Sequence, residues 1–373
     1  MRIAFISTVH GHSWPGSEYL WAETAEKLLN RGDQVFARCS RDFCNATALK
    51  KMIAKGLVYD PFDGRSTRLS RFKEKLVDPL GRLRSWKPDL VVVSAGSAFD
   101  ISYSSYLERF LLEYGVPFIP ICHFNAETFW VDAGSRVTMR RIYAKATAAV
   151  FVCADNHRIT ERQLAQQITN FRVIKPPLPV KLALPLPWPQ GSCWNFACVA
   201  RWESRWKGQD VLFEVLARPE WRERNWQLNL YGEGAEEGYL RDLVKHFGIE
   251  KRVSFLGFVK DRTEIWRKNH IQVFPTRGEG GPMVLTEGMA CGRVAVITDC
   301  GNAREYVEDG KDGFLAEFAT PEIFADALER AWESRDRWEE MGRAAHHKAK
   351  ELANAQPAAQ LLQLLESIAE QKG

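Results

Sequence analysis

Short apolar runs alternate with amphipathic or polar stretches along the first half of the chain. Runs of strand character fall at residues 3–7, 35–39, 57–59, 90–94, 118–121, 149–153 and 171–174. The intervals between them are longer, and the first includes a helical pattern at 17–30 that stops near Gly32. This alternation predicts a doubly wound α/β domain built on a parallel sheet.

A proline-rich segment separates this pattern from a second one of the same kind. Proline at the density found in 176–190 opposes both a helix and a sheet ladder, so we expect a semi-rigid linker there. Strand patterns return at 196–200, 227–231, 253–255, 271–274 and 294–297, and helical patterns fall at 209–216, 283–291, 322–332, 338–352 and 357–368. We therefore predict α/β domains at 1–175 and 191–355, with a helical tail at 356–373.

The stretch 271–315 carries the clearest chemical information. A strand leads into a glycine-rich loop at 276–282 and then into a helix, which places the loop at the carboxyl end of a parallel strand, where open α/β sheets bind ligands. Glu279 and Glu287 have seven residues between them, so both carboxylates can face one crevice. Gly280 and Gly281 expose backbone amides beside a helix amino terminus. These features favour a ligand that carries both hydroxyls and phosphate.

This stretch resembles the signature of the GT-B glycosyltransferases of family GT4. The matching residues are Glu279-Gly280-Gly281-Pro282, Glu287, Met289-Ala290-Cys291-Gly292, Gly301, Glu305-Tyr306-Val307, Asp309-Gly310 and Gly313-Phe314-Leu315. The resemblance is dense in the second domain and weak in the first. It implies an α/β fold of two Rossmann-like domains that face each other across a cleft, with the last helix crossing back to the first domain. It also implies that Glu279 contacts the donor sugar and that Glu287 holds the nucleotide ribose.

Two cations stand in the first loop of the second domain. Arg201 and Lys207 are near one strand end, where fixed positive charge would neutralise a departing diphosphate. Taken alone they would more often be solvated, but Arg201 and the pair Lys207-Gly208 match the GT4 pattern. Gly257 and Phe258 follow the strand at 253–255 on the same edge as Glu279, and with Pro282 they complete the predicted substrate-binding residues of this domain.

The first domain contributes fewer candidates. Its first loop reads Pro15-Gly16-Ser17-Glu18 where GT4 enzymes usually have Gly-Gly-Ser-Glu, and Pro15 removes one amide donor, so the implied phosphate contact is carried to Gly16 alone. His123 follows the strand at 118–121. A lone histidine is usually structural, yet the family places a histidine here beside the donor sugar.

Composition sets limits on the class of protein. The chain has 373 residues, 45% hydrophobic and 26% charged, with a net charge of +4, which is ordinary for a globular protein and too mild to demand nucleic acid. Eight cysteines without a C-x-x-C pair indicate reduced thiols, and neither a signal peptide nor a membrane-length apolar run is evident, so we expect a cytoplasmic protein. No D-x-D and no His/Cys cluster with ligand spacing occurs, so we predict that no metal is required and disfavour a GT-A enzyme.

Three features keep two interpretations open. Residues 66–87 combine leucines at helical spacing with basic residues, which suits either an anionic membrane at the inner membrane face or packing on the first-domain sheet, and Pro79 interrupts the helix. Trp14 and Trp130 could stack on an acceptor sugar or pack in the core. His346-His347 lies in a charged helical stretch and is expected at the surface.

We interpret the chain as a retaining, metal-independent glycosyltransferase. The expected donor is a UDP- or GDP-linked sugar, and the acceptor is a hydroxyl of a sugar or lipid-linked sugar in cell-envelope polysaccharide or glycolipid synthesis. As the family implies, a leaving-group phosphate oxygen takes the acceptor proton, so no protein base is demanded. A GT-B phosphorylase or hydrolase on sugar phosphates and an inactive scaffold subunit are the alternatives. A dinucleotide dehydrogenase is disfavoured because no G-x-G-x-x-G follows the first strand.

Overall fold

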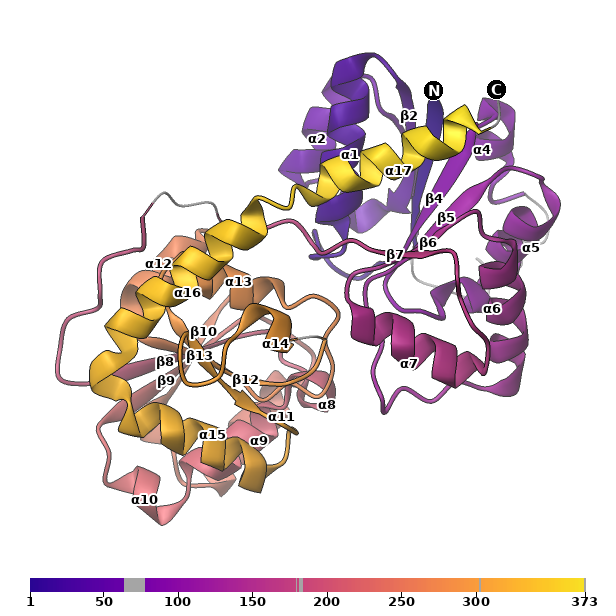
Figure 1. Cartoon of the computed structure of the whole chain (residues 1–373). Helices are drawn as coiled ribbons and strands as arrows, with labels where there is room; N and C mark the ends of the chain where they lie inside the picture. Colours follow the sequence, from indigo (N-terminus) through magenta and orange to yellow (C-terminus); the bar gives the residue numbers. More distant parts are fainter. Residues whose placement is uncertain (64–77, 179, 181–183, 302, 372–373) are drawn as a thin grey trace. The chain divides into compact units, whose positions relative to one another are not determined.

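The computed structural model describes residues 1–63, 78–178, 180, 184–301 and 303–371. The chain divides into two compact units, which are described separately (Figure 1). Unit 1 comprises Met1–Pro177 and Gln356–Gly373, and unit 2 comprises Leu178–Ala355.

Unit 1 is built on a seven-stranded sheet in the order β3-β2-β1-β4-β5-β6-β7, in which every strand pair is parallel. The strands are β1 Arg2–Ser7, β2 Gln34–Ser40, β3 Val58–Phe62, β4 Leu90–Ala95, β5 Phe118–Cys122, β6 Ala149–Phe151 and β7 Phe171–Val173. The helices are α1 Glu18–Arg31, α2 Thr47–Ala54, α4 Gly81–Trp86, α5 Ser105–Glu113, α6 Ala133–Lys145, α7 Ala154–Leu164 and α17 Pro357–Glu370, with 3-10 turns η1 Arg41–Phe43 and η2 Asp100–Tyr103. The predicted doubly wound domain is therefore present.

Unit 2 repeats this plan with a six-stranded parallel sheet in the order β10-β9-β8-β11-β12-β13. The strands are β8 Trp194–Val199, β9 Trp226–Tyr231, β10 Val253–Gly257, β11 Ile271–Phe274, β12 Val294–Thr298 and β13 Gly313–Ala316. The helices are α8 Ser204–Lys207, α9 Gln209–Leu216, α10 Pro219–Arg222, α11 Glu237–His246, α12 Arg262–Lys268, α13 Met283–Ala290, α14 Ala303–Tyr306, α15 Pro321–Glu333 and α16 Trp338–Ala353, with 3-10 turns η3 Glu250–Arg252 and η4 Arg335–Arg337.

Several elements of unit 2 differ from the sequence expectation, among them α8 and β13. Residues 201–207 were expected to be a loop, but their second half forms α8, one short helical turn that ends at Gly208 with a φ of 65°. The edge strand β13 lies within the matched stretch but was not anticipated as a strand, because glycine begins it and only four residues form it.

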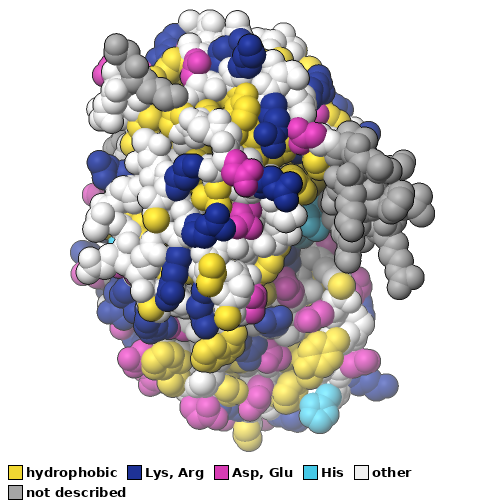
Figure 2. Space-filling model, turned by 90° about the vertical axis from the view of Figure 1, so that its right-hand side faces the viewer, with side chains coloured by type: hydrophobic (Ala, Val, Ile, Leu, Met, Phe, Trp, Pro, Cys, Tyr) yellow, Lys and Arg dark blue, Asp and Glu magenta, His cyan; other side chains and the backbone are white. Residues whose placement is uncertain are grey.

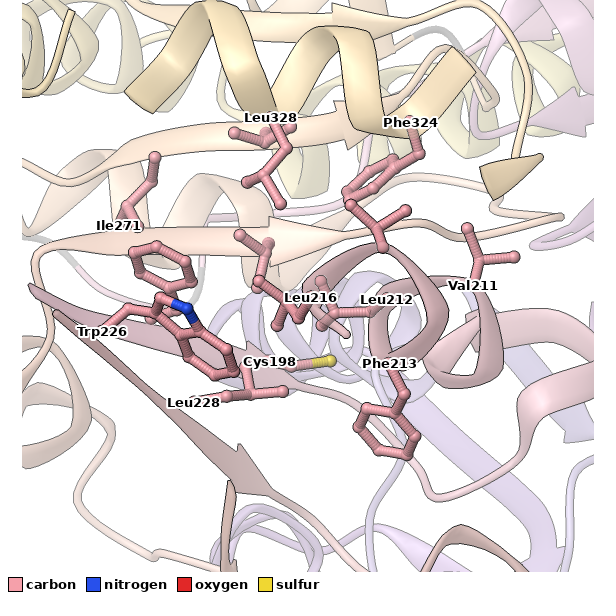
Figure 3. Close-up of a cluster of buried hydrophobic side chains, with 14 of the residues drawn as sticks. Cys198, Val211, Leu212, Phe213, Leu216, Trp226, Leu228, Ile271, Phe324 and Leu328 are labelled. Atoms are coloured by element: carbon pink, nitrogen blue, oxygen red, sulfur yellow. The ribbon is translucent and has the colours of Figure 1, made fainter. Parts of the chain in front are cut away.

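The strand order fixes where ligands can approach. In each sheet the order reverses beside the first strand, between β1 and β4 in unit 1 and between β8 and β11 in unit 2. Open α/β sheets bind ligands at the carboxyl ends of the strands at such a reversal. Below that edge the core of unit 2 is closely packed, with α9 and α15 laying Leu212, Leu216, Phe324 and Leu328 against strand residues such as Leu228 (Figure 3).

The last helix belongs to unit 1. After α16 the chain turns at Gln356, which has a φ of 46°, and α17 then packs along α1 (Figure 1). The hydroxyl of Thr24 on α1 donates to the carbonyl of Ala358 at 3.4 Å, and Leu361 and Leu365 are fully buried in the core of unit 1. The expected return of the C-terminal helix to the first domain is thus observed.

The described end of the proline-rich segment is anchored to unit 2. The buried guanidinium of Arg293 donates to the carbonyl of Pro187 at 2.7 Å, and the amide of Leu186 donates to the carbonyl of Cys291 at 3.1 Å. A Cβ on Gly292 would lie 2.6 Å from Pro185, so glycine is needed for this close approach. Residues 185–187 therefore follow the surface of unit 2.

The structure decides part of the open interpretations. Residues 64–77 lie outside the described part, so the membrane interpretation of 66–87 is not addressed there, while Leu80 and Leu83 at its described end are fully buried in unit 1. Trp14 packs against Trp21 and Phe43 in the core.

His346 is 3% exposed, so its expected surface position is wrong. The ring lies under α13 and its Nδ1 is 2.7 Å from the carbonyl oxygen of Ala290, because α16 turns this position inward. No helix in the described ranges combines the length and apolarity needed to cross a membrane. All eight cysteines lie in the described ranges, and no disulfide joins them.

Candidate active site

Lys207 and Glu279 form the centre of the candidate site. Lys207 ends α8 in the loop that follows β8, and Glu279 lies in the loop that follows β11, so the two side chains come from the two strands that flank the reversal in strand order. The ammonium of Lys207 is 2.6 Å from Oε1 of Glu279, and their side chains are 18% and 20% exposed. The structure thus joins two residues that are 72 positions apart in the sequence.

Short contacts hold the two loops together. The hydroxyl of Thr276 donates to the carbonyl of Trp206 at 2.8 Å, and the amide of Arg277 donates to the same carbonyl at 2.8 Å. Gly208 has a φ of 65°, and a Cβ there would lie 1.9 Å from the carbonyl oxygen of Pro275. Only glycine permits this approach, because both its backbone conformation and the space exclude a side chain.

An ion pair behind the site strengthens the same junction. Both terminal nitrogens of Arg277 donate to the two carboxylate oxygens of Asp210 at 2.8 and 2.7 Å, and one of them also donates to the carbonyl of Ser204 at 2.7 Å. Asp210 is in the first turn of α9, directly after the Lys207-Gly208 pair. A bidentate pair of this kind fixes geometry as well as charge, so it orients Lys207 toward Glu279.

Arg201 lies in the same loop after β8 as Lys207. Its side chain is about half exposed, with Nη2 at 3.4 Å from Glu203, and its carbonyl accepts from the side-chain amide of Gln209 at 2.7 Å. The backbone of Arg201 is therefore fixed, and its guanidinium is half exposed beside Glu203.

The glycine loop presents backbone groups beside α13. Gly280 is buried, Gly281 is partly exposed, and Pro282 precedes the first residue of α13. A Cβ on Gly301 would lie 2.7 Å from the carbonyl oxygen of Glu279, so the loop is held from both sides. The amides at the start of α13 have no intrahelical acceptor and are suited to an anion.

Glu287 is held by an arginine that the sequence did not bring to attention. Its carboxylate is buried, and Nη1 of Arg262 donates to both oxygens at 2.7 and 2.9 Å. Burial raises the pKa of Glu287, while the charge of Arg262 acts in the opposite direction. A carboxylate has about four acceptor positions, so the pair leaves capacity for a ligand hydroxyl. Arg262 begins α12 after β10, and its place in a βα turn was the available signal.

Gly257 and Phe258 end the neighbouring strand β10. Gly257 has a φ of 69°, and its carbonyl accepts from the amide of Gly232 at 2.9 Å. The ring of Phe258 is 61% exposed, which is unusual for phenylalanine and suits a planar partner.

The two candidates of unit 1 stand in the loops after β1 and β5. Gly16 is exposed, and its carbonyl accepts from the amide of Tyr19 at 3.3 Å as α1 begins. His123 lies 3.0 Å through Nε2 from the hydroxyl of Ser94 at the end of β4. Burial lowers the pKa of His123 to about 4, so the imidazole is neutral near pH 7.

Glu18 is a functional candidate that sequence reasoning passed over. It is fully buried at the first position of α1, where its carboxyl accepts from the indole of Trp21 at 2.7 Å and from the hydroxyls of Ser7 and Ser17 at 3.0 Å each. Burial raises the pKa of Glu18 from 4.5 to about 7. A carboxyl that titrates near neutrality is unusual. The sequence did not reveal it, because an acid in the first turn of a helix is common and its burial depends on the tertiary structure.

Across the described ranges, no group of three or more His, Cys, Asp or Glu side chains is arranged to hold a metal ion. The charged groups that converge in unit 2 are instead the ion pairs Lys207–Glu279, Arg277–Asp210 and Arg262–Glu287.

The family match falls within unit 2. Residues 194–334 match the family of glycosyl transferases group 1. The putative glycosyltransferase EpsD of Bacillus subtilis is 29% identical over 40% of this chain and 39% of that protein. The amylovoran biosynthesis glycosyltransferase AmsD of Erwinia amylovora is 27% identical over 28% of this chain and 30% of that protein. The chain spans between 14% and 39% of the length of the first relatives that it matches.

The fold comparison covers nearly the whole chain. The structure of Anabaena HepE in complex with UDP and glucose superposes with a TM-score of 0.76 over 98% of this chain and 99% of that one, at 18% identity. Two parallel sheets with covering helices and this superposition define the GT-B fold, which confirms the predicted architecture. Residues 194–334 in unit 2 are thus similar to glycosyl transferases group 1, and the chain as a whole has the GT-B fold.

Proposed function

We propose that this chain transfers a sugar from a nucleoside diphosphate sugar to a hydroxyl acceptor. The observation that carries the proposal is the Lys207–Glu279 contact of 2.6 Å at the strand reversal of unit 2. Lys207 and Arg201 supply positive charge for the diphosphate as the glycosidic bond breaks. Glu279 orients Lys207 and accepts a hydrogen bond from a hydroxyl of the transferring sugar.

The remaining candidates complete the binding of the donor. Gly280 and Gly281 offer amides, Glu287 accepts ribose hydroxyls, and Phe258 with Gly257 borders the base. UDP is the favoured nucleotide, since HepE, whose fold this chain shares, is described with UDP and glucose. From unit 1, Gly16 provides an amide for phosphate and neutral His123 provides a hydrogen bond to the sugar.

The proposed transfer retains the anomeric configuration. A phosphate oxygen of the leaving group takes the acceptor proton, so neither a protein base nor a metal is assigned a step. The acceptor is placed among saccharides of envelope polysaccharides, as the name of the relative AmsD suggests for that protein. We place this reaction in the cytoplasm.

The test measures release of UDP from a panel of UDP-sugars with saccharide acceptors, with and without EDTA. Lys207→Ala and Glu279→Ala are expected to lower kcat by about 10²- to 10³-fold, because fixed charge acts mainly in the transition state. The matched controls are Lys251→Ala and Glu220→Ala, which change exposed residues of the same unit and should keep full turnover.

Three results would contradict the proposal. Unaltered turnover in folded Lys207→Ala protein would remove the diphosphate role of this residue. Loss of activity in EDTA, followed by recovery when metal is added, would show that the reaction requires a metal. Binding of sugar phosphates without any binding of UDP would favour the phosphorylase alternative.

A further inference from the structure

A cavity in unit 1 lies outside the site described above. It has a volume of about 480 Å³ and is bordered by the loop 127–131 and by α6 and α7. This volume falls in the range of roughly 300–1,000 Å³ that small-molecule sites occupy. The loop begins at His123, so one connection after β5 serves both the candidate active site and this cavity.

The loop is held in place by side-chain amides. The side-chain amide nitrogen of Gln163 donates to the carbonyls of Ala126 and Phe129 at 3.0 and 2.8 Å. Its oxygen accepts from Asn125 at 2.9 Å. The wall of the cavity is therefore preformed, which lowers the ordering cost of binding.

The charge of the lining is positive. Arg136, Arg140 and Arg162 border the cavity together with one acid, Glu127, and Arg162 is paired with that acid. Two guanidinium groups are thus in excess. Figure 2 shows the right-hand side of Figure 1, where α5 and α6 lie, and Lys and Arg side chains are numerous on this face.

These two guanidinium groups keep donors available. Arg136 is partly exposed and makes no side-chain hydrogen bond or ion pair with any described residue. Arg140 uses Nε to donate to the carbonyl of Leu164 at 2.5 Å, and its two terminal nitrogens have no partner among the described residues. The nearby carboxylate of Asp132 is occupied as the cap of α6, accepting from Ser135 at 2.9 and 2.6 Å. Arginine forks of this kind match carboxylates and phosphates.

A large aromatic ring completes the lining. Trp130 is 87% exposed, although tryptophan is normally well buried. An exposed indole offers an apolar plane of the kind that the C–H face of a sugar ring can cover. Cation and aromatic plane therefore lie in one cavity.

We propose that this cavity binds a saccharide that carries a carboxylate or phosphate group, as the anionic part of the acceptor. Arg136 and Arg140 hold the anion, and Trp130 stacks on the sugar ring. This inference rests on the proposed function, since it names the class of acceptor.

The experiment uses the full chain and isothermal titration at low salt with trigalacturonic acid and with neutral galactotriose. Wild-type protein is expected to bind the charged trisaccharide at least about tenfold more tightly. In the double variant Arg136→Gln with Arg140→Gln, the affinity for the charged trisaccharide should fall to that for the neutral one. Trp130→Ala should weaken the binding of both sugars about fivefold, and Trp130→Phe should keep most of the wild-type affinity. The control Arg172→Gln, an exposed arginine on β7, should change neither.

UDP binding, measured in parallel, separates the two proposals. Intact UDP binding with no preference for the charged trisaccharide overturns the cavity assignment alone. Failure of UDP to bind wild-type protein overturns the proposed function instead. Anionic vesicles form the last arm: sedimentation with vesicles, without binding of the trisaccharide, would show a lipid surface as the ligand and overturn the assignment to a saccharide.

Discussion

The two units place chemically different groups at equivalent positions of the same topology. At the strand reversal of unit 2, Lys207 and Glu279 form an ion pair, and Asp210 with Arg277 forms another behind it. At the strand reversal of unit 1 the polar groups are hydroxyls with one carboxylate: Thr8 accepts from the amide of Gly96 at 3.1 Å and donates to Asp100 at 2.7 Å, and Ser94 contacts His123. The edge of unit 2 is built on ion pairs, and the edge of unit 1 on hydroxyls, one carboxylate and a neutral imidazole.

This difference agrees with the two tasks in the proposed reaction. A diphosphate gains charge as it leaves, and preorganised cations stabilise that gain. An acceptor hydroxyl and a sugar need hydrogen bonds instead, which hydroxyls and a neutral imidazole supply without the desolvation cost of a buried charge. The fold is shared, so the side chains at the reversal decide what each unit binds.

Among changes that leave the charged side chains in place, the largest expected effect comes from separating the two loops of unit 2. In Gly208→Ala the added Cβ would meet the carbonyl oxygen of Pro275, so Lys207 and Glu279 should move apart. We expect kcat to fall about 100-fold, the cost of misplacing a catalytic group by about 1 Å. Gly238→Ala, where a Cβ meets nothing within 4 Å, is the matched control in the same unit. Equal kcat values for the two variants would show that loop contact is not required.

A smaller effect is expected from the ion pair behind the site. Asp210→Asn keeps the size of the side chain but removes its charge, so Arg277 loses part of its hold on the loop that carries Glu279. We expect kcat to fall about tenfold with little change in KM, because a charge-assisted bond contributes about 1.5–3 kcal/mol. A change confined to the melting temperature would assign the pair to stability alone.

In unit 1 the buried carboxyl of Glu18 should reveal itself through pH. Because its pKa is about 7 in the folded chain and near 4.5 when unfolded, its contribution to stability is complete below pH 4.5 and is lost as pH rises through 7. The loss amounts to about 3 kcal/mol. Glu18→Gln lacks this loss, so its melting temperature relative to wild type should rise by several degrees between pH 5 and pH 8. A difference independent of pH would contradict the shift.

The smallest expected effect is at His123. Its lowered pKa of about 4 keeps the ring neutral from pH 8 to pH 5, and protonation begins only as pH falls toward 4. The ring nitrogen shifts of His123, identified by their absence in His123→Gln, should stay constant in an NMR titration over that interval. A midpoint between pH 6 and 7 would make this edge of unit 1 chargeable and weaken the contrast with unit 2.

Local patterns were enough to locate most elements. Predicted and observed bounds agree for α9 at Gln209–Leu216 and for β11 at Ile271–Phe274, because both are apolar segments with unambiguous periodicity. Two of the departures in unit 2 are short elements. α8 has four residues and β13 begins with glycine, so neither contains enough positions to establish a period.

The sequence by itself determined the order of strands and helices, the glycine loop and the identity of Lys207, Glu279 and Glu287 as candidates, because these follow from local patterns and a motif. Only the tertiary structure decided which of them meet. In the structure Lys207 forms an ion pair with Glu279, and Glu287 forms one with Arg262. Burial of Glu18 raises the pKa of its carboxyl. Ion pairing and desolvation depend on distances between residues far apart in the chain, and those distances are fixed by the packing of loops at the sheet edge.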